Sequence, residues 1–195
     1  MARRSDHTKK ELTDLAVQKG IELIEKEGIS GLSARQVAAN MGYTVGTLYH
    51  VFGSLDHFIL HIHARTLDQW HAQLSLGLKR HETDRLHFLA GAYIDFARKN
   101  YNRWSALFEY RASKDTVIPG WYTEKLERLF VLLENALLPH VGKSRRKAKR
   151  SARILWASIH GICILSLSGK LDMTGSEKAE VLVNSLLETY LRGLE

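Results

Sequence analysis

The sequence predicts an all-α protein of about nine helices, and three observations carry this prediction. Only two prolines, Pro119 and Pro139, interrupt the 195 residues. No run of alternating polar and apolar residues indicates a sheet. Apolar residues instead recur at the spacing of one helical face, and residues that start or stop helices flank these stretches. Hydrophobic residues make up 45% of the chain, enough for a buried core.

The first predicted helix covers Lys9 to Glu27. Its apolar residues, among them Ala16, Leu23 and Ile24, recur on one face, and Gly28 follows where a helix commonly stops. We expect this helix to brace the two that follow it.

Two short helices joined by a glycine turn are predicted within residues 31–52. Ser33 precedes the first of them and can accept hydrogen bonds from the free amides of a helix start. Val37 and Met41 then share a face, and Gly42 tolerates the left-handed backbone that ends such a helix. This is the pattern of a helix-turn-helix.

The second of these helices begins behind Thr44 and has two faces. Leu48 and Phe52 lie one turn apart and face inward. The outer face is small, hydroxylic or aromatic, so that the backbone can approach a ligand closely. Because the second helix of such a motif enters the major groove, duplex DNA is the predicted partner. The outer residues are Val45, Gly46, Thr47, Tyr49 and His50.

These residues also spell a motif: Leu-Ser-x-Arg-x-Val-Ala, then Met-Gly-Tyr-Thr-x-Gly-Thr-Leu-Tyr-x-x-Phe, within residues 32–52. The motif resembles the TetR family of bacterial transcriptional regulators. The resemblance covers the first sixty or so residues, and the length and helical character of the remainder match that family. It implies that Arg35 contacts a phosphate or base, and that Val45, Thr47, Tyr49 and His50 lie in the groove.

One departure from the family pattern concerns the start of the fourth helix. The family usually has a lysine there that grips a phosphate, whereas this chain continues from Phe52 through Gly53, Ser54 and Leu55 to Asp56. Ser54 can still cap the helix and present backbone amides to a phosphate. A basic arm before the first helix can neutralise further phosphates. The predicted DNA-binding residues are therefore Arg35, Thr44, Val45, Gly46, Thr47, Tyr49, His50, Ser54, Arg3 and Arg4.

The net charge of +7 is distributed unevenly. Residues 1–53 hold seven basic and six acidic side chains, whereas most of the excess lies in Lys143–Arg150, with Arg153 beyond it. This basic run is either a second surface that touches DNA or the solvated start of a helix. We favour the solvated segment, because runs of like charge most often mark one and because the resemblance implies a position far from the DNA.

A long fourth helix from about Ser54 to His81 is expected to link the DNA-reading part to the rest, since no Pro, Gly-rich or polar linker separates them. The domains are thus predicted as residues 1–53, which bind DNA, and residues 54–195, which bind an effector and dimerise. The later helices are predicted at Asp84–Asn100, Asn102–Ser113, Pro119–Leu138, Arg145–Lys170 and Ser176–Arg192.

The last two helices resemble a dimerisation surface, because small residues among large apolar ones allow close helix approach. An ordinary core within one chain is the alternative. A homodimer is favoured, since two-fold dimers match the half-sites of a palindromic operator. The predicted dimer residues are Ser158, Gly161, Leu165, Leu182, Leu186 and Tyr190.

The segment Trp156-Ala-Ser-Ile-His160-Gly161 is similar to the Trp-x-x-x-His-Gly signature of one TetR C-terminal subgroup. His160 on an apolar helix is more often a hydrogen-bonded core residue than a ligand contact. The middle of the chain is nevertheless rich in aromatics, and ligand pockets in proteins use mainly apolar and aromatic walls. The predicted residues for a small hydrophobic or aromatic effector are Trp70, Phe96, Trp104, Phe108, Trp121 and His160.

The predicted function is a DNA-binding transcriptional regulator, commonly a repressor that an effector releases. Two alternatives stay open: a constitutive structural DNA binder without effector, and a metal-responsive regulator using His57 and His61 at i, i+4. No acidic or cysteine partner stands at a matching spacing, so no metal site and no cofactor are predicted. No nucleophile elbow, phosphate loop or catalytic carboxylate cluster supports an enzyme.

The compartment is predicted to be the bacterial cytoplasm, with the protein on the nucleoid when bound to its operator. The lone Cys163 cannot form an internal disulfide, no signal peptide precedes the first helix, and the longest apolar stretch, Ile154–Gly169, fits a buried helix better than a membrane span.

Overall fold

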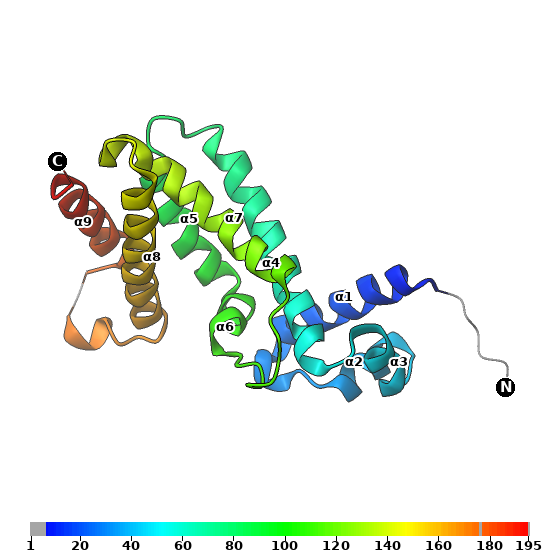
Figure 1. Ribbon diagram of the computed structural model, residues 1–195. Coiled ribbons are helices and arrows are strands. Elements are labelled where there is room, and N and C mark those ends of the chain that lie inside the picture. The colour runs from blue at the N-terminus through cyan, green and yellow to red at the C-terminus, as the bar shows by residue number, and fades with distance from the viewer. Residues whose placement is uncertain (1–6, 176, 195) are drawn as a thin grey trace, which may run out of the picture. The chain divides into compact units, whose positions relative to one another are not determined.

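The computed structural model describes residues 7–175 and 177–194, and the regular structure in these ranges is entirely helical (Figure 1). The predicted all-α class is confirmed. The nine α-helices of the described chain are α1 (Lys9–Glu27), α2 (Ala34–Met41), α3 (Val45–Phe52), α4 (Leu55–Leu78), α5 (Arg85–Lys99), α6 (Tyr101–Glu109), α7 (Gly120–Leu137), α8 (Arg145–Leu167) and α9 (Ala179–Arg192). Short 3-10 helices lie at Ile29–Gly31, Leu138–Val141 and Asp172–Thr174.

The chain packs as two compact units. The N-terminal unit comprises residues up to 68 together with 100–122, and the C-terminal unit comprises 69–99 together with 123 onward, so that α4 contributes to both. Since α6 and the segment after it belong with the first helices, no single cut in the sequence separates the units. The functional division into residues 1–53 and 54–195 stays a prediction.

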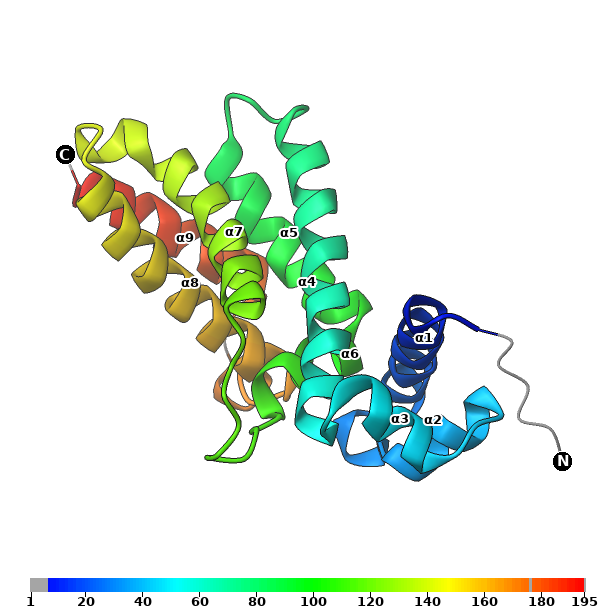
Figure 2. The same ribbon diagram turned by 45° about the vertical axis from the view of Figure 1, so that its right-hand side comes forward.

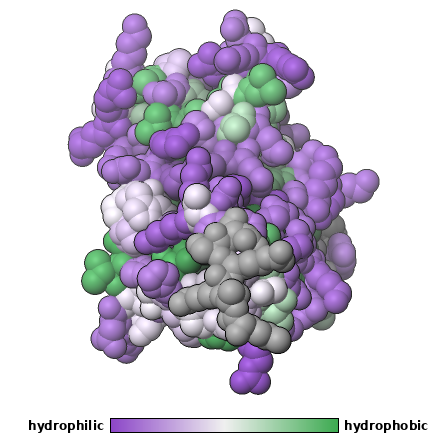
Figure 3. All heavy atoms as spheres, turned by 90° about the vertical axis from the view of Figure 1, so that its right-hand side faces the viewer, coloured by the Kyte–Doolittle hydropathy of each residue, from purple (hydrophilic) through white to green (hydrophobic). Residues whose placement is uncertain are grey.

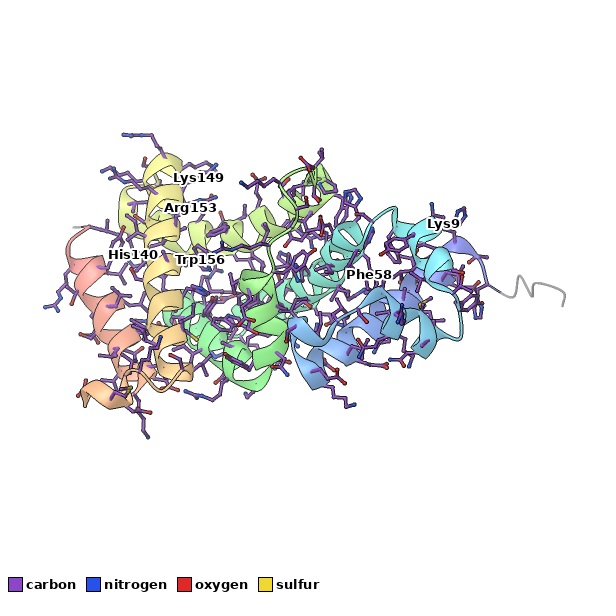
Figure 4. The ribbon with its side chains drawn as sticks, turned by 90° about the horizontal axis from the view of Figure 1, so that it is seen from below. Lys9, Phe58, His140, Lys149, Arg153 and Trp156 are labelled. Atoms are coloured by element: carbon purple, nitrogen blue, oxygen red, sulfur yellow. The ribbon has the colours of Figure 1, made fainter. Side chains whose placement is uncertain are left out.

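The N-terminal unit is organised around α1, which has the predicted bounds and packs against α2, α3 and α6. Its core holds Val37, Leu48 and Phe58, each at most 1% exposed. Figure 4 labels Phe58 among the helices of this unit. At Gly20 the first helix approaches α4 closely: a Cβ there would lie 2.4 Å from Ile62 Cδ1 and 2.9 Å from Phe58 Cζ.

The sixth helix ends earlier than predicted, at Glu109 instead of Ser113. The segment that follows is held by the Asp56 carboxylate in the first turn of α4. Asp56 accepts hydrogen bonds from the hydroxyls of Tyr110 and Thr116, and from the Ser113 amide at 3.0 Å. These hydrogen bonds lower the pKa of Asp56, with that from Thr116 as the largest cause. We call this group the Asp56 cluster.

Other helix ends also differ from the prediction by a few residues. The eighth helix stops at Leu167, because Gly169 adopts φ 68° and the Lys170 amide donates to the Leu165 carbonyl, which closes the last turn. The fourth helix spans Leu55–Leu78. The ninth begins at Ala179, and its predicted first residue, Ser176, lies outside the described residues.

The C-terminal unit is built on α5, α8 and α9, which pack against one another (Figure 2). Leu155, Val183 and Leu187 are at most 1% exposed in its core, as is the single cysteine, Cys163. Burial raises the pKa of the Cys163 thiol to about 11. Across the described ranges, no helix combines the length and the apolar character that crossing a bilayer requires.

The close approach at Gly20 predicts a steric cost for any side chain there. We expect Gly20→Ala to lower the free energy of unfolding by about 1–2 kcal/mol, because overpacking against the buried Phe58 and Ile62 outweighs the better helix propensity of alanine. Urea denaturation measures this. Gly91→Ala is the matched control: Gly91 is exposed in α5 with no atom within 4 Å of a new Cβ, so a gain of about 0.5–1 kcal/mol is expected. Equal gains for both variants would contradict the close approach.

The Asp56 cluster predicts a pH-dependent contribution to stability. Asp56→Ala is expected to lower the free energy of unfolding by about 2 kcal/mol at pH 7, since three donors lose a charged acceptor. The folded pKa is below the unfolded one, so the difference between wild type and variant should be complete above pH about 4 and shrink as the pH falls through the folded pKa.

Asp115→Ala, in the same segment, is the control for the Asp56 variant, because its carboxylate is exposed and holds no part of the cluster. An Asp56→Ala difference that persisted undiminished at pH 2 would contradict the role of the carboxylate charge.

Candidate nucleic-acid interface

The helix-turn-helix forms where the sequence predicts it, because both of its helices are capped by hydroxyl side chains. Ser33 Oγ accepts a hydrogen bond from the Gln36 amide at 3.2 Å and starts α2. Gly42 ends α2 in the left-handed conformation, at φ 73° and ψ 25°. Thr44 Oγ1 accepts from the Thr47 amide at 3.3 Å and starts α3. Both helices are therefore fixed at their N-termini by local chemistry.

Five residues of α3 have the exposure that the sequence predicts: two inner residues are buried, and three outer residues are exposed. Leu48 and Phe52 are buried, whereas Tyr49 is 43% exposed and His50 is exposed. Gly46 is exposed as well, and a Cβ there would meet only Thr44 Oγ1, at 3.6 Å. The backbone at the start of α3 is thus open to a close approach.

Two of the residues predicted to lie in the DNA groove are less exposed to solvent than the prediction of an outer face implies. Val45 is half-buried and packs against the core. Thr47 is half-buried, and its hydroxyl lies 3.2 Å from the hydroxyl of the exposed Thr44. A hydroxyl pair at the N-terminus of α3 can donate to or accept from a phosphate or a base edge.

The remaining predicted DNA-binding residues come from three different segments. Arg35 is exposed in the first turn of α2. Ser54 Oγ accepts from the His57 amide at 3.1 Å and so caps α4 as predicted. Arg3 and Arg4 lie outside the described residues. Seen from the side shown in Figure 3, the molecule presents mostly hydrophilic side chains, with some hydrophobic ones among them.

One contact beside the helix-turn-helix was not predicted. His7, immediately before α1, lies with Nδ1 2.7 Å from the hydroxyl of Tyr43, in the turn between α2 and α3. The two rings meet edge to face, with centroids 6.0 Å apart. The contact joins residues 36 positions apart, so no local sequence pattern could indicate it.

The predicted effector residues divide between the two units. In the C-terminal unit, Trp70 stacks on Phe96, with ring centroids 4.8 Å apart. The ring centroids of Trp70 and Tyr93 are 5.3 Å apart. The Tyr93 hydroxyl is 2.6 Å from His160 Nδ1, and Trp156 stacks on His160. We call these five residues the aromatic run. Burial lowers the pKa of His160, which favours the neutral ring.

The aromatic run contains a buried donor without a partner. Trp70 is 8% exposed, and its indole Nε1 has no hydrogen-bond acceptor among the described residues. Such groups are rare in protein interiors and call for an explanation.

The other three predicted effector residues lie in the N-terminal unit. Trp104 is buried and contacts Phe108 edge to face, at 5.4 Å between centroids. The ring centroids of Trp121 and His61 are 4.7 Å apart. Within their own unit, these rings pack with neighbours from α4 and α6.

The predicted dimer residues have mixed environments. Leu165 is 42% exposed, whereas Gly161, Leu182 and Leu186 are half-buried. Ser158 donates to the Ile154 carbonyl within α8. Tyr190 donates to Ser151 Oγ at 3.0 Å, so its hydroxyl joins α9 to α8 within one chain. Apolar side chains also exposed on these two helices are Ile154, Ile164 and Val181.

The histidine pair that suggested a metal site has other neighbours. His57 Nε2 is 3.4 Å from the Val117 carbonyl, and the His61 ring packs against Phe52 and Trp121. In the part of the chain that the structure describes, no three His, Cys, Asp or Glu side chains are grouped as a metal ion would need.

Comparison with known proteins finds two family models that match this chain. The family model "Bacterial regulatory proteins, tetR family" matches residues 17–62, and "Tetracyclin repressor-like, C-terminal domain" matches residues 86–190. The chain is similar to the uncharacterized HTH-type transcriptional regulator YobS of Bacillus subtilis, with 24% identity over all of this chain and 96% of the relative.

Solved structures share the fold. A protein of unknown function from Rhodococcus sp. RHA1 is 21% identical, with a TM-score of 0.76 over 98% of each chain. The transcriptional regulator FadR from Bacillus subtilis, solved in complex with stearoyl-CoA, is 14% identical, with a TM-score of 0.62 over 93% of this chain and 99% of that one. With a capped helix-turn-helix in one unit and family models that match both parts of the chain, the protein belongs to the TetR family of DNA-binding transcriptional regulators and is not an enzyme.

Proposed function

We propose that the protein is a homodimeric repressor that binds a palindromic operator through α2 and α3 and is released by a small hydrophobic or aromatic effector. The observation that carries the proposal is the division of α3 into a buried face, Leu48 and Phe52, and an exposed N-terminal face that includes Gly46, Tyr49 and His50.

The exposed face of α3 has the chemistry of a base reader. The Thr44 and Thr47 hydroxyls offer donors and acceptors, Tyr49 adds a phenol, and Gly46 leaves the backbone accessible. In helix-turn-helix proteins the N-terminal residues of the second helix contact base edges. Arg35 and the amides at the start of α4, behind Ser54, would then position the motif on phosphates.

Dimerisation through α8 and α9 is supported by large apolar side chains that one chain leaves in water. Ile154, Ile164, Leu165 and Val181 are between 42% and 46% exposed. Burying them against a second copy removes that apolar area from solvent, and a two-fold dimer presents two reading helices to two half-sites.

An effector site along the aromatic run is supported by its ring surfaces and by its unpartnered donor. An aromatic ligand can stack on such rings, and an acceptor atom on the ligand would satisfy the Trp70 indole N–H. We therefore assign the effector to flat or apolar molecules that carry a carbonyl or carboxylate oxygen. That the similar FadR was solved with an acyl-CoA agrees with ligand binding in this fold.

We infer that the effector releases the operator DNA through α4, the helix that contributes residues to both units. Residues 55–68 of α4 lie in the N-terminal unit and carry Asp56, whereas the rest lies in the C-terminal unit and carries Trp70. A ligand that binds better to one position of α4 would shift the population between dimers that fit the operator and dimers that do not.

The DNA-binding proposal predicts the effect of removing the exposed phenol. Tyr49→Ala should weaken operator binding between about 5-fold and 150-fold, the usual range for a contact to a base, while the thermal stability stays unchanged. The operator is obtained first, by selecting bound duplexes from a random pool at physiological salt, and affinity is then measured by fluorescence anisotropy.

In the same experiment Glu82→Ala, an exposed substitution in the loop between α4 and α5, is the control and should bind like wild type. Two chains per palindromic duplex are expected. Unchanged binding by the Tyr49 variant would overturn the role of α3, and one chain per duplex would overturn the dimer.

The effector proposal predicts a selective loss in Trp70→Phe, which keeps a stacking ring and removes the N–H. With naphthoate and a long-chain fatty acid as probes, we expect compounds that release operator DNA from wild type to release it at least about 5-fold less effectively from this variant, since one hydrogen bond is lost. Without ligand, thermal stability should fall by the cavity cost of a smaller ring in a buried site, with no added loss from the N–H, because the donor that is removed has no partner.

Two other results would direct attention to the alternatives. Indifference of operator affinity to every apolar and aromatic compound would favour a constitutive binder. Release by a transition metal ion, abolished by His57→Ala, would favour the metal-responsive regulator.

A further inference from the structure

A cationic surface lies at the start of α8, within residues 143–150. Six of these eight side chains are basic, none is acidic, and all six are exposed. None forms an ion pair within the described ranges. We call this surface the α8 basic face: Lys143, Arg145, Arg146, Lys147, Lys149 and Arg150.

The register of α8 separates these charges from the core. Ala148, Ser151, Ala152 and Leu155 are buried on the opposite side of the helix. One turn further along, Arg153 has partners within the chain. It forms an ion pair with Glu134, and its Cζ lies 4.4 Å from the centroid of the Phe130 ring. Figure 4 shows Lys149, Arg153 and Trp156 in succession along α8. Along α8, the unpaired charge is therefore confined to the first two turns, and Lys143 lies just before them.

This arrangement does not serve the stability of the helix. Cations at a helix N-terminus oppose the helix dipole, and like charges four residues apart, as Arg145 with Lys149 and Arg146 with Arg150, repel each other. An anionic partner removes both penalties.

The distribution of charge indicates which anion fits. The run alone carries a net +6 in a chain of net +7, whereas residues 1–53, which contain the reading helices, hold seven basic against six acidic residues. Non-specific binding to DNA depends on neutralising phosphates. The reading part offers little net charge for this, and the α8 basic face offers most of what the chain has.

The dimensions and the composition of the face favour duplex DNA over other polyanions. Arg145 to Arg150 span about 7.5 Å along the helix axis, at 1.5 Å per residue. Duplex DNA carries about one negative charge per 1.7 Å, so about four phosphate charges lie within that length. The exposed positions include no aromatic or aliphatic side chain, which a membrane-inserting helix or a protein interface of this size would need.

We propose that the α8 basic face is a second DNA-binding surface, independent of sequence, that adds phosphate attraction to the small net charge of residues 1–53. Its long side chains release counterions from the duplex without reading bases. The face binds duplex DNA through its phosphates, whatever the base sequence.

The test compares two triple variants of the full chain with equal net charge. Arg146→Gln/Lys149→Gln/Arg150→Gln removes half of the face. Lys79→Gln/Arg80→Gln/Lys170→Gln removes three exposed, unpaired cations from elsewhere in the C-terminal unit. Binding to a 25-bp duplex without operator sequence is measured by anisotropy over a salt series, and circular dichroism checks the helix content of each variant.

The expected result is specific to the face. Its variant should reduce the slope of log K against log salt by about 2 to 3, near 0.9 per lost phosphate contact, and weaken binding at low salt at least about 10-fold. The control should stay within about 2-fold of wild type. Operator and random duplex should lose affinity by the same factor, so that their ratio is preserved.

Three results would overturn the proposal: equal losses in both triple variants, which would reflect net charge alone; no loss in either; or unchanged DNA binding with loss of adsorption to vesicles of 30% phosphatidylserine, which would assign the face to anionic lipid. Tyr49→Ala in the same assay separates this inference from the role of α3. It should weaken binding to operator duplex by about 5-fold to 150-fold and leave the salt-dependent binding to random duplex unchanged.

Discussion

The crossing of α1 over the first half of α4 is the constraint on which the helix-turn-helix of this protein depends. At Gly20 the two helices approach so closely that a single methyl group would meet Phe58 and Ile62. The same α1 packs against α2 and α3, whose inner faces are too short to form a core by themselves. The position of α3 thus depends on a contact that lies outside the helix-turn-helix, between α1 and the part of α4 that belongs to the N-terminal unit.

The parts of this fold that sequence could predict are those governed by local chemistry. The caps Ser33 and Thr44 and the left-handed Gly42 act within three or four residues, so the bounds of α2 and α3 follow from them. The early end of α6 could not be predicted, because Asp56 and its partners are more than fifty positions apart. For the same reason, a list of aromatic residues could not reveal how they divide between the two units.

The exposed face of α3 and the bulk of the positive charge lie on different helices of this chain. The exposed face of α3 is hydroxylic and aromatic, with a single glycine that exposes backbone, while most of the net positive charge lies on the first turns of α8. A DNA-contacting surface with little net charge gains little affinity from counterion release, so it is held only weakly at a wrong sequence. With this arrangement, substitutions on α3 can change sequence selectivity and substitutions at the start of α8 can change overall DNA affinity. Because the two sites are separate, their effects should add.

The buried Cys163 has a practical consequence for work with this regulator. As the chain's single cysteine, packed under α5 and α9 with a thiol that stays protonated at neutral pH, it presents almost no thiolate to an alkylating dye. A cysteine introduced on the protein surface would therefore be labelled selectively in the natural background. Pairs of such labels on the two units would report the distance between them by energy transfer, with and without DNA.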